Sequence, residues 1–226
     1  MKSRLRPGSG RMSLLVTAGS TREKIDPVRF ISNYSTGVFG YEIAREAKKR
    51  GHRVTLISGP ACPEPPPGVK VVEVESALDM GRAVKKHIKK CDCLIMAAAV
   101  SDWRAASPSK RKIKRGRKNK KLELVENPDI LRGLGKMEKK ILVGFALETE
   151  RLADNAAEKL KKKNLDLVVA NKIGGKTSPF GRNPTEILML DRFGNKSILR
   201  NRTKRELAGV ILDKVSELKL DNKFSV

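Results

Sequence analysis

The sequence has few cysteines and no long apolar run. Its three cysteines, Cys62, Cys91 and Cys93, show neither CxxC spacing nor a nearby histidine, which argues against a disulfide scaffold and against a zinc site. No run approaches the roughly 20 apolar residues of a membrane-spanning helix, so we expect no membrane association. Cys93 heads an apolar stretch and is interpreted as a buried thiol in a reducing cytoplasm.

Acidic residues are scarce relative to basic ones. The 49 Lys and Arg residues face 25 Asp and Glu, which leaves a net charge of +24. Such an excess is typical of nucleic-acid binders. However, the densest basic run, residues 110–121, contains no aromatic residue, and aromatics are only 4% of the chain. With few rings on which single strands could stack, we expect no specific nucleic acid partner, although charge alone leaves the question open.

The length of the chain suits one domain. Its 226 residues, 39% of them hydrophobic, are enough for an α/β domain with a substantial core. Residues 1–11 are basic, contain Pro and Gly and lack the apolar segment of a signal peptide, so we expect a disordered leader or tag there. No repeat or internal linker follows, and residues 12–226 are predicted to form a single domain.

Apolar stretches typical of strands alternate with amphipathic stretches typical of helices. This alternation predicts an α/β, Rossmann-like fold, with a doubly wound and mostly parallel sheet. Residues 186–190 and 196–199 predict an antiparallel hairpin. The predicted strands are 14–18, 53–58, 69–74, 94–99, 141–146 and 167–170. The predicted helices are 41–50 closed by Gly51, 77–90, one that starts after Asn127 as its N-cap, 150–163, and one that starts with a capping box of Thr203 and Glu206.

In open α/β sheets, ligands bind beyond the carboxyl ends of the strands. The connection from Gly19 to Gly40 is long for a compact domain, and loops of this length are usually functional. Just before the next predicted helix it contains Ser35, Thr36 and Gly37. The backbone N–H groups of a helix N-terminus suit a phosphate, but capping of the helix by Ser35 or Thr36 explains these residues equally well. The segment lacks GxGxxG, which disfavours a plain NAD-binding fold.

Two other places suggest ligand contacts. After the strand 94–99, small residues allow close approach of a ligand, and Asp102 could accept hydrogen bonds from a nucleoside or hold a metal that bridges phosphates. Lys159 and Lys163 lie one helical turn apart and share a face. For these two lysines taken alone, a solvated basic face is the simpler interpretation.

Taken together, short motifs from Leu14 to the last helix form an ordered set. They are Val16-Thr17-Ala18-Gly19, Thr21-Arg22-Glu23, residues 26–33 (DPVRFISN), residues 98–104 (AAVSDWR), Lys112-Ile113-Lys114, Asn127-Pro128-Asp129-Ile130, Val143-Gly144-Phe145-Ala146, Glu148-Thr149, Lys163-Asn164-Leu165-Asp166 and Ala170-Asn171. In number, order and spacing they resemble the phosphopantothenoylcysteine synthetase family, the ligase module of coenzyme A biosynthesis. One departure is that Val38-Phe39 stands where the family usually has Lys-Met.

The resemblance implies a two-step ligation. CTP, with Mg²⁺, activates the carboxylate of 4′-phosphopantothenate as an acyl-cytidylate, and the amine of L-cysteine then attacks it to give 4′-phosphopantothenoylcysteine and CMP. It also implies a homodimer, with a dimer-contacting strand at residues 122–125. No FMN is expected, because the flavin-dependent decarboxylase that usually precedes this module is absent from the sequence. The choice of CTP over ATP depends on the resemblance alone.

The resemblance also assigns roles to individual residues. Asn33 corresponds to the asparagine that holds the activated acyl intermediate, and Lys112 to a catalytic lysine on a mobile flap. Ser35, Thr36 and Gly37 form the loop expected at a substrate phosphate. The residues expected to contact the nucleotide are Ala97, Ala98, Ala99, Asp102, Pro128, Asp129, Ile130, Phe145, Lys159 and Lys163; the metal ligands are not identified.

Two alternatives of other classes stay open at this point. One is an NAD(P)-dependent reductase on the same fold, which the missing GxGxxG motif disfavours. The other is a nucleic-acid-binding protein that uses the basic run 110–121. Binding through that run would fall steeply with salt.

Overall fold

The computed structural model describes residues 10–60, 62–116, 121–134, 137, 140–174 and 179–224, with no account of the side chains of 222–224. Of the proposed leader 1–11, residues 1–9 lie outside this set, as do residues 117–120 of the basic run. Among the described helices, none is both long and apolar enough to cross a membrane.

Eight strands form the central sheet, in the order β12-β11-β10-β9-β6-β1-β4-β5. The six from β10 to β5 run parallel, whereas β11 and β12 form an antiparallel hairpin at one edge. The mostly parallel sheet and its hairpin are therefore confirmed. The strands are β1 (Ser13–Ala18), β4 (Arg53–Ser58), β5 (Lys70–Glu73), β6 (Cys93–Met96), β9 (Ile141–Glu148), β10 (Leu167–Lys172), β11 (Thr185–Asp191) and β12 (Lys196–Arg202).

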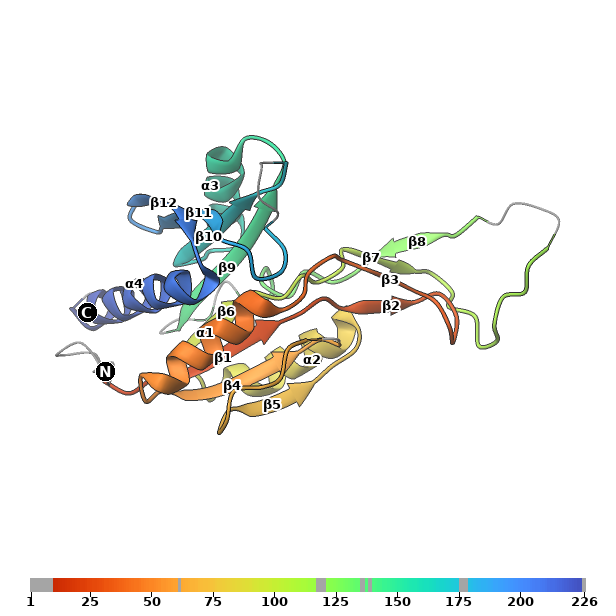
Figure 1. Ribbon diagram of the computed structural model, residues 1–226, viewed down its shortest axis with the longest axis horizontal. Coiled ribbons are helices and arrows are strands. Elements are labelled where there is room, and N and C mark those ends of the chain that lie inside the picture. Colours follow the sequence, from red (N-terminus) through yellow and green to blue (C-terminus); the bar gives the residue numbers. More distant parts are fainter. Residues whose placement is uncertain are drawn as a thin grey trace.

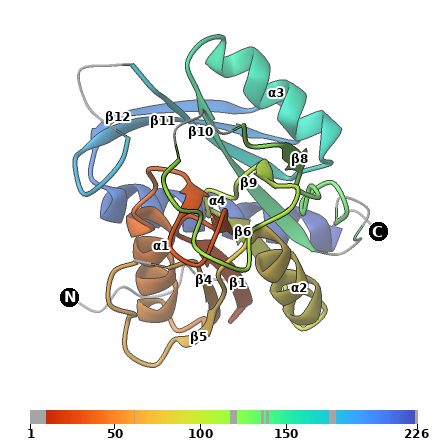
Figure 2. The ribbon, with the colours of Figure 1, turned by 90° about the vertical axis from the view of Figure 1, so that its right-hand side faces the viewer.

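Helices cover both faces of the sheet (Figure 2). Helices α1 (Val38–Lys49) and α4 (Lys204–Phe224) pack on one face, and α2 (Ala77–Ile88) and α3 (Leu152–Lys162) pack on the other. Neighbouring residues of β1 point to opposite faces, so Leu14 and Val16 enter the core beneath α1 and α4 while Leu15 enters the other core. Double burial explains why the strands are almost wholly apolar, and the doubly wound fold is confirmed.

The helix ends follow local chemistry in most places. Gly51, with φ of 86°, closes α1 as predicted. The capping box before α4 is also present, because Glu206 N–H donates to Thr203 Oγ1 and Thr203 N–H donates to the Glu206 carboxylate. Gly40 lies where α1 crosses β1. A Cβ at Gly40 would come within 2.8 Å of Thr17 O and 2.6 Å of Ala18 Cβ, so only glycine allows this approach.

The prediction of a helix after Asn127 is wrong. Residues 130–134 form turns, and no helix occurs among the described residues between β8 and β9. Instead of capping a helix, the Asn127 side chain donates to Ser101 O at 2.8 Å and accepts from Arg104 at 3.1 Å. Asp129 accepts from Arg132 N–H at 3.0 Å, which stabilises a turn. Because the Asn127 amide makes these long-range bonds, it does not act as the helix N-cap that the local sequence predicted.

Two short hairpins form an arm that projects from the sheet (Figure 1). We call the described residues of 22–32 and 103–126 the arm, and the other described residues the body. The arm contains β2 (Arg22–Lys24) paired with β3 (Phe30–Ser32), and β7 (Trp103–Ala105) paired with β8 (Leu124–Glu126). The strand predicted at residues 122–125 thus corresponds to β8, two residues further along.

Candidate active site

A cavity of about 780 Å³ opens at the carboxyl ends of the parallel strands. It lies where the winding of the sheet reverses, since β4 and β5 follow on one side of β1 whereas β6 and β9 follow on the other. At such a switch point the connections leave in opposite directions and a crevice remains between them. The cavity is therefore where the fold itself predicts a ligand.

Almost every candidate residue of the sequence analysis lines this cavity. Lys112 is the exception, because it lies on the arm and is exposed. The lining candidates are Asn33, Ser35, Thr36, Gly37, Ala97, Ala98, Ala99, Asp102, Pro128, Asp129, Ile130, Phe145, Lys159 and Lys163. The structure thus brings together residues from five separate segments, while their roles stay predictions.

The small residues after β6 form a fixed wall of the cavity. Ala98 N–H donates to Thr17 Oγ1 at 3.1 Å, Ala99 N–H donates to Gly19 O at 2.8 Å, and Ser101 N–H donates to Thr21 Oγ1 at 3.0 Å. These bonds join the segment after β6 to the segment after β1. Asn33 joins the same wall, because its amide donates to Ala99 O at 3.1 Å. One hydrogen of that amide is thereby used, and among the described residues no hydrogen bond to the amide oxygen is found.

The N-terminus of α1 opens into the cavity without a side-chain cap. Gly37, with φ of 74°, occupies the N-cap position, and neither Ser35 nor Thr36 caps the helix. A side chain at Gly37 would collide with Cys62 Sγ, which a Cβ would approach to 2.5 Å. The capping interpretation of Ser35 and Thr36 is therefore wrong. The first N–H groups of α1 are left for an anion, which the helix dipole favours.

Lys159 and Lys163 face the cavity and are only partly exposed, so the interpretation as a solvated basic face is wrong. The Lys159 ammonium donates to Phe145 O, and the Lys163 ammonium lies 3.0 Å from the Asp129 carboxylate. Burial, and next the charge of Lys163, lower the pKa of Lys159. Two cations held this close favour an anionic ligand.

A third lysine of the cavity, Lys204, was not anticipated. It is 5% exposed, begins α4, and donates to the carbonyls of Pro179 and Gly181. Burial lowers its pKa. Its sequence context marks a helix start, but no local signal shows that this helix start reaches the cavity. Asn127, from the motif 127–130, also lines the cavity. The other lining residues, to which the sequence analysis gave no contact, are Tyr34, Val38, Phe39, Met96, Val100, Ser101, Trp103, Glu126, Leu131, Arg132, Ala146, Leu147, Asn171, Ile173, Pro179 and Phe180.

The position where the chain departs from its apparent family also lies here. Phe39 packs edge-on against Phe145, with ring centroids 5.1 Å apart. Such edge-to-face pairs are favourable. The residue pair Val38-Phe39 therefore replaces a cationic and flexible pair with an apolar wall of the cavity.

The cavity does not contain a ready-made metal cage. Among the described residues, no group of three or more His, Cys, Asp or Glu side chains could hold an ion. Asp129 is already paired with Lys163, so Asp102 is the lining aspartate left for a cation. A Mg²⁺ ion commonly uses one or two carboxylates together with substrate phosphates and water. The residues present fit that mode.

Comparison with known proteins gives a consistent result. The sequence model of the "DNA/pantothenate metabolism flavoprotein C-terminal domain" matches residues 10–218. A "Cysteine/Cysteine sulfinic acid decarboxylase" from an unknown prokaryote is 41% identical over 216 residues, which are 94% of this chain and 60% of that protein. The "Coenzyme A biosynthesis bifunctional protein CoaBC" of Escherichia coli K12 is 38% identical over 209 residues, which are 90% of this chain and 51% of that protein. The chain thus spans between half and three-fifths of the length of these relatives.

Solved structures agree with the fold. The C-terminal domain of a CoaBC protein superimposes with a TM-score of 0.79 at 38% identity, covering 94% of this chain and 97% of that one. A Cab2 H337A mutant in complex with phosphopantothenate-cysteine has a TM-score of 0.76 at 17% identity, covering 93% of this chain and 88% of that one. At that identity the second likeness concerns the fold.

Proposed function

Because this chain belongs to the family of DNA/pantothenate metabolism flavoprotein C-terminal domains, we propose that it is a ligase that joins 4′-phosphopantothenate to L-cysteine at the expense of CTP. The proposal depends mainly on the cavity. It is lined by the residues that the family resemblance assigned to nucleotide binding and to binding of the acyl intermediate. The phosphopantothenate-cysteine ligand of Cab2 and the coenzyme A role of CoaBC support the choice of substrates.

In the first step, a carboxylate oxygen of 4′-phosphopantothenate attacks the α-phosphorus of CTP. The bond from that phosphorus to the bridging oxygen breaks, and pyrophosphate leaves with the electron pair. A carboxylate approaching a triphosphate is repelled by it, so the barrier falls where cations offset this repulsion. Lys159, Lys163 and Lys204 line the cavity and supply such charge. The uncapped N-terminus of α1 adds N–H donors for a phosphate.

Mg²⁺ would enter as part of the nucleotide complex and neutralise phosphate charge. Of the two aspartates that line the cavity, Asp102 is the one left to contribute a ligand, because Asp129 is paired with Lys163. We propose no other protein ligand for the ion.

In the second step, the amine of cysteine attacks the acyl carbonyl, CMP leaves, and the nitrogen loses a proton. Asn33 lies against Ala99 at the wall of the cavity. Its amide oxygen can accept from one group of the mixed anhydride while the second amide hydrogen donates to another. Asn33 would thus hold the reactive acyl group in place for the amine. We expect this chemistry to take place in the cytoplasm.

We propose that the protein acts as a homodimer that associates through the arm. Five of the ten large hydrophobic side chains exposed among the described residues lie on it, namely Val28, Phe30, Trp103, Leu122 and Leu124. Two-stranded hairpins have little stability by themselves, and a concentration of exposed apolar side chains on one projecting arm favours an interaction there. A second copy of the arm would cover this surface.

The test is pyrophosphate release from the purified protein with CTP, Mg²⁺ and 4′-phosphopantothenate, with and without cysteine. We expect turnover that depends on cysteine, and a loss of roughly 100-fold or more in kcat for Asn33→Ala. Asn195→Ala, at the β11–β12 turn away from the cavity, is the matched control and should keep full activity. ATP in place of CTP tests the nucleotide choice. No cysteine-dependent turnover with either nucleotide would refute the proposal.

A further inference from the structure

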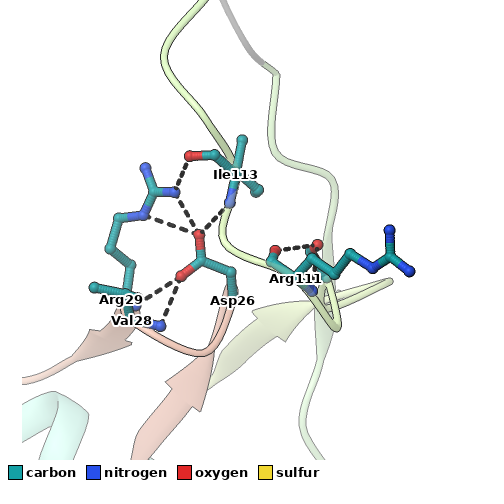
Figure 3. A network of polar contacts seen from close by, with 6 residues as sticks. Asp26, Val28, Arg29, Arg111 and Ile113 are labelled. Atoms are coloured by element: carbon teal, nitrogen blue, oxygen red, sulfur yellow. Dashed lines mark hydrogen bonds and ion pairs between the residues drawn. The ribbon is translucent and has the colours of Figure 1, made fainter.

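The root of the predicted flap is attached to the turn between β2 and β3 by a small polar cluster, which we call the latch. The latch consists of the side chains of Asp26 and Arg29 and the backbone of Ile113 (Figure 3). Ile113 is the neighbour of Lys112 in the chain but lies 84 residues beyond Arg29. The latch therefore joins two segments that are distant in sequence.

Both backbone groups of Ile113 are held. Its N–H donates to Asp26 Oδ2 at 3.0 Å, and its carbonyl accepts from the Arg29 guanidinium at 2.7 Å. A second contact lies close by, since Ser109 N–H donates to Ile25 O at 2.9 Å. The stretch from Ser109 to Ile113 is thus fixed to the β2–β3 turn before the arm continues outward.

The two oxygens of Asp26 have separate partners. Oδ1 accepts from the N–H groups of Val28 and Arg29 at 2.8 and 2.9 Å, which stabilises the turn. Oδ2 accepts from the Arg29 side chain and from Ile113. The Asp26 side chain has no exposed surface, whereas half of the Arg29 side chain is exposed. The Arg29 guanidinium beside it, together with the backbone donors, holds the pKa of Asp26 well below its usual range, so the carboxylate is charged at neutral pH.

A turn alone would need only the oxygen that faces Val28 and Arg29. The second oxygen of Asp26 and the Arg29 guanidinium bond to the backbone of Ile113 and fix it in place. Lys112, the candidate flap lysine, is the residue just before Ile113. Burial of the Asp26 carboxylate costs desolvation, and in some proteins such a group is retained because it specifies a position. Misplacement of a reacting group by about 1 Å can cost about 100-fold in rate.

We propose that Asp26 is a positioning residue, which with Arg29 fixes the backbone of Ile113 and thereby sets the place from which Lys112 acts. This inference rests on the proposed ligase function and on the carried-over role of Lys112. It assigns no contact with substrate to Asp26 itself.

Asp26→Asn tests the latch without removing the turn. The amide oxygen can still accept from Val28 and Arg29, but the NH₂ group then faces the donors of Arg29 and Ile113, so the second set of bonds is lost. Asp79→Asn is the matched control, because the Asp79 carboxylate also accepts from a nearby backbone N–H, that of Ser76, and pairs with an arginine three residues later, but on α2. Arg29→Lys is a second test, since one ammonium cannot reproduce the forked guanidinium contacts.

The rate of hydrogen exchange at the Ile113 amide measures how firmly the latch holds this N–H group, and the measurement does not depend on enzyme activity. We expect exchange at least about tenfold faster in Asp26→Asn and in Arg29→Lys, and unchanged in Asp79→Asn. Circular dichroism and thermal melting confirm that each variant is folded. Unchanged exchange at Ile113 in folded Asp26→Asn would overturn the latch.

Kinetics then test the positioning role. Asp26→Asn should lower kcat for pyrophosphate release by about tenfold or more, with the KM for cysteine within about threefold of the parent value. In a Lys112→Ala background the same change should have no further effect, since the two residues act as one unit. An equal loss in that background would mean that Asp26 does not act through Lys112, and would overturn the positioning role. If the parent protein is inactive, the proposed ligase function fails, while the exchange experiment still decides whether the latch exists.

Discussion

In the body, residues in the middle of β1 have no exposed surface, whereas in the arm the residues at both ends of β3 and of β8 are exposed. The strands of the body lie between two layers of helices, and apolar packing on both faces holds them. The arm has no such layers. It depends on strand pairing, on the latch and on contacts between β2 and β7.

The candidate site lies where these two regions meet. Asn33 follows β3, Asp102 precedes β7, and Asn127 follows β8, so three of the chain segments that line the cavity lead directly into the arm. The cavity therefore has a rigid wall from the sheet and a second wall whose position depends on the arm. Changes in the body should act mainly on folding, and changes in the arm mainly on association and catalysis.

The largest effect on stability is expected at the crossing of α1 and β1. Gly40→Ala places a Cβ against the backbone oxygen of Thr17, which cannot move without shifting β1. We expect a loss of about 1–3 kcal/mol, or a fall in Tm of roughly 2–4 °C per kcal/mol. The control is Gly209→Ala in α4, where a Cβ meets only the flexible end of Arg50 and stability should change by less than about 1 kcal/mol. Equal melting temperatures for the two variants would contradict this account.

At the wall of the cavity, Lys159→Met should change stability and binding in opposite directions, with weaker binding of CTP and a more stable ligand-free protein. The change removes a partly buried cation whose ammonium donates to Phe145 O, so CTP affinity should fall about tenfold. Because the folded-state pKa of Lys159 is lowered, the unfolded chain binds this proton more tightly. The stability of the ligand-free protein should therefore rise with pH between the folded-state and unfolded-state pKa values.

In Lys159→Met the rise of stability with pH should be smaller, and the variant should be somewhat more stable than the parent at neutral pH. Calorimetric titration with CTP and melting curves between pH 7 and 10 measure both effects. Lys161→Met, at an exposed position of the same helix, is the control and should leave both unchanged. Weaker binding by that control would show a diffuse charge effect rather than a site.

Charging the arm should affect association and spare folding. Leu124 is 42% exposed on β8, and Leu124→Lys should shift the protein toward monomer in sedimentation experiments, with a change in Tm that corresponds to about 0.5 kcal/mol or less. Ile198→Lys places the same charge on an exposed apolar position of the body. A dimer that survives the first change and dissociates with the second would put the interface on the sheet edge.

The smallest effect is expected at Ser101. Its hydroxyl is buried and, within the described residues, has no hydrogen-bond partner. Ser101→Ala should leave stability unchanged or raise it by up to about 1 kcal/mol, because an unsatisfied buried hydroxyl is costly. Ser58→Ala removes a buried hydroxyl that is bonded to Tyr41 and to Gly59 O, and should cost about 1 kcal/mol. Melting curves of the two variants make the comparison.

Local sequence was sufficient for most of the fold because the relevant signals are local. The apolar run of β1, the glycine that closes α1 and the capping box of α4 each depend on a few neighbouring residues. Where the prediction failed, long-range bonds outweighed local preference. Asn127 has the sequence context of a helix cap, yet its amide is taken by Ser101 and Arg104, and the chain turns instead.

By itself, the sequence determined most of the strand and helix pattern, the family resemblance and the identity of the candidate residues that line the cavity. Only the tertiary structure decided that Lys204 joins them, that Lys112 stays outside on the arm, and that Asp26 and Arg29 hold the residue next to it. The physical reason is distance along the chain. Hydrophobic periodicity and helix caps depend on residues a few positions apart in the sequence. The burial of Lys204 and the latch depend on segments that meet only after the sheet has formed.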